Sequence, residues 1–148
     1  MRKAWPAILL ILAGCGGSKR DAGPDVAVRN VTLPDGVVIA AELKITPAEQ
    51  QVGMMFRTEL AHDRGMLFVN ARPQAVPYWM HDCNFPLDII FIGTDHRVVE
   101  VAENAAPCHS APEQCPTYGG HAPAQYVLEI NGGDGAKHGV KEGAVIAF

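Results

Sequence analysis

The run Leu87-Asp88-Ile89-Ile90-Phe91-Ile92 is the most apolar stretch of the chain outside its N-terminal region. A strand points successive side chains to opposite faces, so Leu87 and Ile89 fall on one face and Ile90 on the other. Because both faces are apolar, this strand is expected to lie inside the fold. Any architecture for the chain must therefore cover both faces of a central strand.

Alternating patterns on either side of this run predict further strands. Residues 37–45 alternate as a half-buried strand, and the turn sequence Pro34-Asp35-Gly36 closes a hairpin with residues 26–33. Four more strands are expected at residues 66–69, 97–103, 125–130 and 144–148. In the strand at 125–130, Leu128 is predicted to point inward, and Val127 and Glu129 outward into solvent.

One clear helix start occurs at Thr46-Pro47-Ala48-Glu49. The Thr46 hydroxyl can cap the helix, Pro47 suits the first helical position, and Glu49 completes a capping box. The helix is predicted to fade by Leu60 and to bury an apolar face that consists of Ala48, Val52, Met55 and Phe56. A close approach to a neighbouring strand is the expected reason for Gly53 within it. A second, short helix is expected within residues 132–138.

These elements predict a mainly β fold with one or two short helices. Strand-rich chains with frequent turns form compact sandwiches, jelly rolls or small barrels.

Three sequence blocks carry a family resemblance. They are Trp79-Met80 followed by residues 86–92, Gly53–Leu60 followed by residues 65–68, and Val127–Ile130 followed by residues 139–143. In this order and over about residues 39–148, they resemble the family known as domain of unknown function 192. The resemblance implies a compact β fold of jelly-roll or sandwich type, and export from the cytoplasm. It implies no particular activity. The segment His81-Asp82-Cys83 departs from the family's usual Lys-Asn-Thr.

The first residues have the organisation of a bacterial lipoprotein signal. Basic residues precede a short apolar run that ends in Leu12-Ala13-Gly14-Cys15, a sequence that resembles a lipobox. The apolar run is far shorter than the ~20 residues that a spanning helix needs. Residues 1–14 are therefore expected to be a signal peptide, Cys15 the lipidated residue, residues 15–25 a flexible tether and residues 26–148 one globular domain. Ordinary signal cleavage with an incidental cysteine is the alternative.

This signal predicts where the protein resides. It would be lipid-anchored in the cell envelope, and Gly16 after Cys15 favours the outer membrane, facing the periplasm or the cell surface. Removal of residues 1–14 would leave 10 of the 12 basic residues against 16 acidic ones, a net charge of −6. Since the basic residues form no stripe, nucleic-acid binding is not expected. A protein or small-molecule partner remains open.

Three cysteines remain once Cys15 carries lipid. Cys108 and Cys115 are seven residues apart in a Pro-rich loop, and we favour a disulfide between them. Pairing of Cys83 with either one is the alternative. A weak metal site could instead form from Cys83, His81 and His109, because sulfur and imidazole bind zinc or copper. Their spacing lacks the tight motifs of such sites, so no metal or other cofactor is predicted.

Arg57 and Asp88 are charges embedded in apolar blocks. A buried charge needs a partner, so an Arg57–Asp88 ion pair is a natural hypothesis. The pair could simply order the fold, or it could line a ligand pocket beside Tyr78 and Trp79.

Three functions compete at this level. The favoured one is a lipid-anchored, non-catalytic binding or interaction module, with Arg57, Tyr78, Trp79 and Asp88 as the ligand-binding candidates. A hydrolase that uses Asp88 and Arg57 beside Trp79 is the second. A metal or redox protein that uses Cys83 and the cysteine loop is the third.

Overall fold

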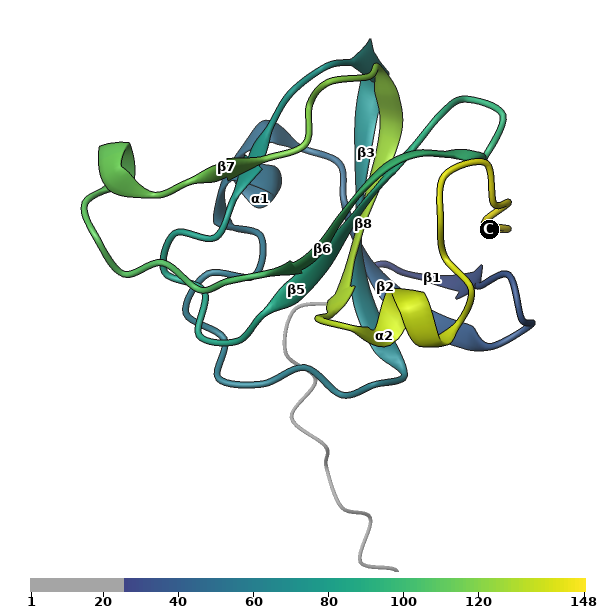
Figure 1. Ribbon diagram of the computed structural model, residues 1–148, viewed down its shortest axis with the longest axis horizontal. Helices are drawn as coiled ribbons and strands as arrows, with labels where there is room; N and C mark the ends of the chain where they lie inside the picture. The colour runs from purple at the N-terminus through teal and green to yellow at the C-terminus, as the bar shows by residue number, and fades with distance from the viewer. Residues whose placement is uncertain (1–25) are drawn as a thin grey trace, which may run out of the picture.

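A six-stranded sheet forms the centre of the computed structural model, which describes residues 26–148 (Figure 1). Its strand order is β1-β2-β3-β8-β5-β6, and a two-stranded ribbon of β4 and β7 lies apart from it. All neighbouring strands are antiparallel except β2 and β3, which run parallel. The predicted signal peptide, Cys15 and the tether lie outside the described residues.

The structure contains eight strands, two short α-helices and one 3-10 helix within residues 26–148. In chain order they are β1 (Val28–Thr32), β2 (Val38–Lys44), α1 (Pro47–Val52), β3 (Arg64–Gln74), β4 (Tyr78–Trp79), β5 (Leu87–Ile92), β6 (Val98–Ala105), η1 (Pro112–Gln114), β7 (Thr117–Tyr118), β8 (Ala124–Asn131) and α2 (Asp134–Lys137).

The strand β5 is buried along its whole length, as the sequence predicts. It pairs with β6 on one side and β8 on the other. Its two faces belong to two separate hydrophobic cores: Ile89 and Phe91 pack in one core, and Ile90 and Ile92 in the other. The central strand thus divides the interior into two layers.

Different segments cover the two faces of the sheet. In Figure 1, α1 and the β4–β7 ribbon lie to the left of the central strands, and α2 and the C-terminal segment lie to the right. The α1-side core includes Met54, Met80 and Cys83. The opposite core includes Val140 and Ile146. This arrangement is mainly β and sandwich-like, and since β1 and β6 do not pair, the sheet does not close into a barrel.

The sequence correctly predicts that one face of β8 is buried, but it wrongly predicts that the other face is exposed to solvent. Leu128 is buried, but Val127 and Glu129 on the other face are only 1% and 4% exposed. The reason is that the α1-side layer covers the face that alternation alone assigned to solvent. Glu129 is therefore a buried acid.

The helix α1 begins as predicted and ends early. The Thr46 hydroxyl accepts from the Glu49 backbone N–H, and the Glu49 carboxylate accepts from the Thr46 N–H. The helix stops at Gly53, whose φ of 47° is unfavourable for other residues. A Cβ there would lie 3.3 Å from the Phe68 ring, which confirms the predicted close approach to a strand.

The predicted apolar face of this helix is also wrong. Val52 and Phe56 are 55% and 69% exposed, whereas Met54 is 2% exposed. Because the helix ends at Val52, its 3.6-residue period no longer governs the residues that follow.

The predicted last strand does not form as a strand. Residues 144–148 make only isolated bridges, from Val145 to Arg97 and from Ala147 to Thr32. These bridges still hold the C-terminal segment against the sheet, where Ile146 is fully buried.

Asp88 is a structural hub of this fold. It is 1% exposed on β5. Its Oδ1 accepts backbone N–H bonds from Asn104 at 2.7 Å and Gly133 at 2.9 Å, and its Oδ2 accepts one from Gly135 at 2.7 Å. The side chain thereby ties the end of β6 and the start of α2 to the central strand.

We predict that Asp88→Ala destabilises the protein by about 3 kcal/mol, because three buried N–H donors would lose their acceptor. Urea unfolding of the variant and the wild type measures the difference. Asp63→Ala, at an exposed carboxylate, is the matched control and should change stability by less than about 0.5 kcal/mol. Equal stability of the two variants would contradict the role of Asp88 as a hub.

Candidate functional site

A cleft lies on the α1 side of the sheet, and we call it the Glu129 cleft. It consists of an inner hollow of about 40 Å³ and an outer one of about 200 Å³, which share Gln50, Tyr78 and Trp79. The inner hollow is lined in addition by Val52, Gly53, Met54, Met55, Phe68, Cys83 and Glu129, and the outer one by Asn70, Gln74, Val76 and Pro77. Segments from α1, β3, β4 and β8 therefore meet at one place.

Glu129 is the buried acid of this cleft. It is held in the middle of the sheet, opposite Met66 of β3 and Ile89 of β5. Its Oε2 has no hydrogen-bond partner among residues 26–148. Burial raises the pKa of Glu129 to about 8, and the positive charge of Arg57 opposes this rise. A carboxyl with this pKa exchanges its proton near neutral pH.

Aromatic side chains form one wall of the cleft. The Tyr78 ring makes edge-on contacts with Phe68 and Phe91, at centroid distances of 5.2 and 5.7 Å. Burial, together with the nearby Glu129 charge, raises the pKa of Tyr78, so the phenol keeps its proton. Trp79 is 40% exposed and stacks on His81 at 5.1 Å. This wall is fixed by packing and faces partly into solvent.

Arg57 has a different partner from the one expected. Its guanidinium donates two bonds to Glu42, from Nη1 to Oε1 at 2.7 Å and from Nη2 to Oε2 at 2.6 Å. The hypothesis of an Arg57–Asp88 pair is wrong, because Asp88 is occupied by backbone donors. The same bidentate contact lowers the pKa of Glu42 and raises that of Arg57.

The segment after α1 is fastened to the loop before β5. The Phe56 N–H donates to the Asp82 carbonyl at 2.8 Å, and Asn84 Nδ2 donates to the Arg57 carbonyl at 2.7 Å. These bonds fix the position of Met54 and Met55 beside Cys83. The segment after α1, which borders the cleft, is therefore held in place by hydrogen bonds to the loop before β5.

The cysteines follow the favoured prediction. Cys108 and Cys115 form a disulfide with a Cα–Cα distance of 5.8 Å. Cys83 is a free, buried thiol, and burial raises its pKa to about 12, with a smaller contribution from the Glu129 charge.

The weak metal candidates do not form a cluster. His109 is exposed, and His81 Nδ1 is buried without a hydrogen bond within the described part of the chain. No group of three or more His, Cys, Asp or Glu side chains in residues 26–148 is arranged to hold a metal ion. The disulfide also occupies two of the sulfurs, so Cys83 is the one free thiol among the described residues. Backbone hydrogen bonds of Met80 and Asp82 with Cys108 do place the Cys83 segment beside the cysteine loop.

The four ligand-binding candidates from sequence are only partly together. Tyr78 and Trp79 line the Glu129 cleft, and Arg57 lies close enough to influence the Glu129 charge. Asp88 does not line the cleft, and its carboxylate accepts hydrogen bonds from backbone N–H groups instead. The hydrolase hypothesis loses its acid for the same reason.

Glu129 is the residue that the sequence pattern assigns to solvent and the structure places in the cleft. Its block, Val127-Leu128-Glu129-Ile130, embeds one acid among apolar residues. The same signal drew attention to Asp88, and it could have identified Glu129 as well.

The Glu129 carboxyl, whose Oε2 has no hydrogen-bond partner among residues 26–148, lines the same hollow as the aromatic rings of Tyr78 and Trp79. When ionised, Glu129 would attract a positively charged donor, and the ring faces of Tyr78 and Trp79 favour cations. The Arg57 guanidinium is hydrogen-bonded to Glu42, so Glu129 Oε2 still has no donor of its own among the described residues.

The comparisons with known proteins agree with this fold. The family profile DUF192, described as "Uncharacterized ACR, COG1430", matches residues 30–148. A protein of unknown function from Novosphingobium aromaticivorans DSM 12444 has a similar structure, with a TM-score of 0.75 and 38% identity over 90% of this chain and 100% of that one. A comparison with curated proteins gave no match.

A second solved structure is also similar. It is a proposed transcription regulator from Sinorhizobium meliloti 1021, with a TM-score of 0.74 and 31% identity over 85% of this chain and 97% of that one. Within residues 26–148, no helix has the length and apolarity needed to cross a membrane.

The raised pKa of Glu129 predicts a pH dependence of stability. The unfolded chain would ionise this group near its ordinary pKa of 4.5, whereas the folded chain keeps the proton to about pH 8. Stability contributed by the protonated form is thus fully present below pH 4.5 and falls as pH rises toward 8. Glu129→Gln, which stays neutral, should remove this fall and be more stable than the wild type at pH 8 by a few kcal/mol.

Urea unfolding of both proteins at pH 5, 6.5 and 8 measures the effect. The difference between the two curves isolates Glu129, since the carboxyls with lowered pKa values act equally in both proteins. A difference that stays constant with pH would show that Glu129 ionises normally.

Proposed function

The chain belongs to the DUF192 family, and from that premise we propose that it is a lipid-anchored envelope protein that binds a small organic amine in the Glu129 cleft. The family is described as uncharacterized, so the proposal rests on the chemistry of this chain.

One observation carries it: Glu129 is 4% exposed, lines the cleft, and has an Oε2 atom without a partner among the described residues. An unpaired buried polar atom costs about 1–3 kcal/mol, and more when charged. A ligand ammonium group would supply the missing donor and stabilise the ionised form.

The shape of the cleft fits a molecule with one charged end. The inner hollow of about 40 Å³ accommodates a small head group against Glu129. The outer hollow of about 200 Å³ accommodates an apolar body beside Val76, Pro77 and Trp79. Trp79 and Tyr78 would add cation–π attraction of about 0.5–2 kcal/mol.

Binding is favoured over catalysis by the residues that the cleft lacks. Among the described residues that line it, Glu129 is the only acid. The Cys83 thiol also lines the cleft, and a pKa of about 12 keeps it protonated at neutral pH. A general acid and a nucleophile or base are both needed for the hydrolase mechanism considered from sequence.

The envelope location is proposed from the N-terminal sequence. The lipobox-like Leu12-Ala13-Gly14-Cys15 supports lipid attachment at Cys15, and residues 16–25 have the composition of a tether. Gly16 supports the outer membrane, facing the periplasm or the cell surface. The membrane would then be one partner and the amine the other. The negative net charge favours neither DNA nor RNA, and the regulatory role proposed for the Sinorhizobium protein is that protein's own.

Benzylamine is a suitable probe of the cleft. With methyl-labelled methionine in the full chain, it should shift the Met54 and Met55 methyl resonances in NMR spectra. Glu129→Gln should weaken binding at least tenfold, because the neutral amide cannot pair with an ammonium ion. Affinity should rise from pH 6 to pH 8.5 as Glu129 ionises around its pKa of about 8.

Two controls make this test specific. Benzyl alcohol has the same body without the charge and should bind at least tenfold more weakly. Glu59→Gln changes an exposed carboxylate and should leave the affinity unchanged. Equal binding of benzylamine by the Glu129 and Glu59 variants would refute the proposal.

Lipid attachment is tested separately in cells. An alkyne-labelled palmitate should label the full chain, and Cys15→Ser should abolish the label, since no other residue offers the lipobox cysteine. Cys83→Ser is the matched cysteine control and should keep the label. An unlabelled wild-type protein would overturn the anchor while leaving the cleft proposal intact.

A further inference from the structure

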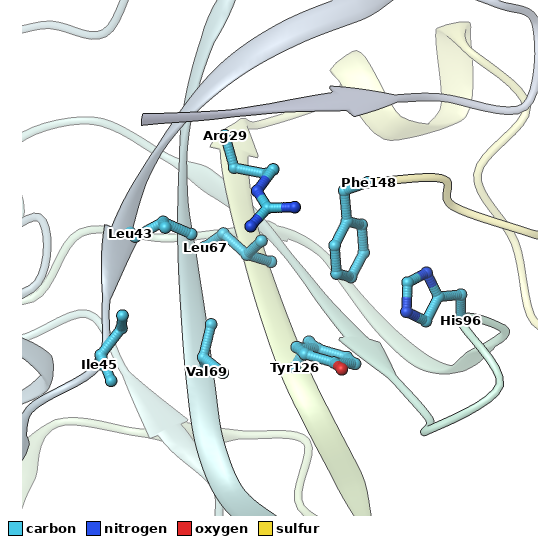
Figure 2. Close-up of a pocket in the computed structure, with 8 residues that line it drawn as sticks. All are labelled: Arg29, Leu43, Ile45, Leu67, Val69, His96, Tyr126 and Phe148. Carbon is cyan, nitrogen blue, oxygen red and sulfur yellow. The ribbon is translucent and has the colours of Figure 1, made fainter. Parts of the chain in front are cut away.

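A second hollow lies on the opposite face of the sheet, and we call it the Arg29 pocket (Figure 2). It has a volume of about 300 Å³. Leu43, Leu67 and Val69, from β2 and β3, lie along its floor, with Ile45 beyond them. The volume falls at the lower end of the range for small-molecule sites, which are mostly apolar with a few polar groups.

One wall of the pocket is a packed aromatic cluster. The Phe148 ring stacks on His96 at a centroid distance of 4.3 Å and meets Tyr126 edge-on at 4.9 Å. Tyr126 and His96 also contact each other edge-on at 5.3 Å. Because each ring fixes the others, the wall offers preformed flat surfaces rather than mobile chains.

Arg29 supplies the polar group. Strand alternation places it on the same face of β1 as Val31, which is fully buried. Arg29 therefore lies on the face of β1 that turns toward this core, at an exposed position near the N-terminal end of the strand. Figure 2 shows its guanidinium directed into the hollow, near Phe148 and Leu67.

Within the described part of the chain, the Arg29 guanidinium takes part in no ion pair. No carboxylate within residues 26–148 lies within ion-pair distance of Arg29, whereas Arg57 and Arg97 each have one. An arginine fork presents parallel N–H donors that match the two oxygens of a carboxylate. Charge complementarity therefore selects an anion.

We propose that the Arg29 pocket binds a small monocarboxylate that carries a flat apolar group. The carboxylate would pair with Arg29, and the flat group would stack against the Phe148 and Tyr126 wall above the aliphatic floor. This site is independent of the Glu129 cleft, because the two hollows share no lining residue and lie on opposite faces of the sheet.

The chemistry also distinguishes this occupant from others. An amine would be repelled by Arg29, and an uncharged aromatic molecule would leave the guanidinium unpaired. The aromatic wall favours a planar body, since offset and edge-on ring contacts contribute about 0.5–1.5 kcal/mol beyond area burial.

Phenylacetate is the probe for the experiment. The full chain, with labelled methyl groups in Ile, Leu, Val and Met, is titrated with it and followed by NMR. The Leu43, Leu67 and Val69 methyl resonances should shift in a saturable manner, while those of Met54 and Met55 in the other cleft should not. Phenylacetamide, which lacks the charge, should bind at least tenfold more weakly.

Arg29→Gln should weaken phenylacetate binding at least tenfold. Arg29 is exposed, so this variant should fold, and an unchanged methyl spectrum without ligand verifies that it does. Arg64→Gln removes another exposed arginine, at the start of β3, and should bind like the wild type.

Three outcomes would overturn the proposal. They are the absence of saturable shifts up to 10 mM phenylacetate, equal affinity for phenylacetamide, and an Arg29→Gln variant that binds as well as the Arg64→Gln control. None of these depends on whether the Glu129 cleft binds an amine.

Discussion

The burial of β5 and β8 on both faces is the constraint on which the rest of this structure depends. Two hydrogen-bonded strands at the centre of the sheet have apolar side chains on each face, so the chain must build two cores instead of one. The β1–β2 hairpin, α2 and the C-terminal segment serve one face. The segment from α1 to β4, with the disulfide-closed loop, serves the other. Each cover is short, and hollows remain on both faces of the sheet.

Two buried carboxyls on these adjacent strands have opposite surroundings. Asp88 on β5 accepts three backbone N–H bonds and thereby connects β6 and α2 to the core. Glu129 on β8 lines a cleft, and its Oε2 lacks a partner within the described chain. The two buried acids therefore differ in their hydrogen bonding. The protein itself supplies the donors for Asp88, whereas Glu129 Oε2 remains available to a donor from a ligand. The same contrast separates Arg57, which Glu42 neutralises, from Arg29.

The sequence predicted correctly those features that depend only on residues close together in the chain. The capping box at Thr46 and Glu49, the Pro34–Gly36 turn and the doubly buried strand β5 all depend on neighbouring residues, and the structure confirms them. The favoured disulfide is confirmed for the same reason, since a short loop joins its cysteines. The mainly β, sandwich-like class followed from the sum of these elements.

The errors arose wherever a distant segment decides the outcome. The partner of Arg57 is Glu42, fifteen residues earlier on β2, and no pattern along the chain connects the two. Val127 and Glu129 were assigned to solvent because alternation cannot reveal whether a second layer covers a strand. Because α1 ends before Gly53, Met54 is buried in the core and Phe56, which was expected there, is exposed. Of the residues that line the candidate cleft, Tyr78 and Trp79 are ligand-binding candidates from the sequence, whereas the sequence pattern assigns Glu129 to solvent.

The acid is nonetheless the residue whose presence most needs explanation. On its face of β8 the neighbour Val127 is apolar, and a leucine or glutamine at position 129 would avoid the cost of burying an ionisable group. Most residues of this chain suit their positions in the fold. Where a buried residue does not, as an ionisable side chain in a core does not, a functional site is the expected reason. Glu129 meets that description more closely than Asp88, because the fold itself supplies all the partners of Asp88. The structural argument for a ligand in the cleft therefore does not depend on the identity of the amine: it depends on a carboxyl that folding buried and did not satisfy.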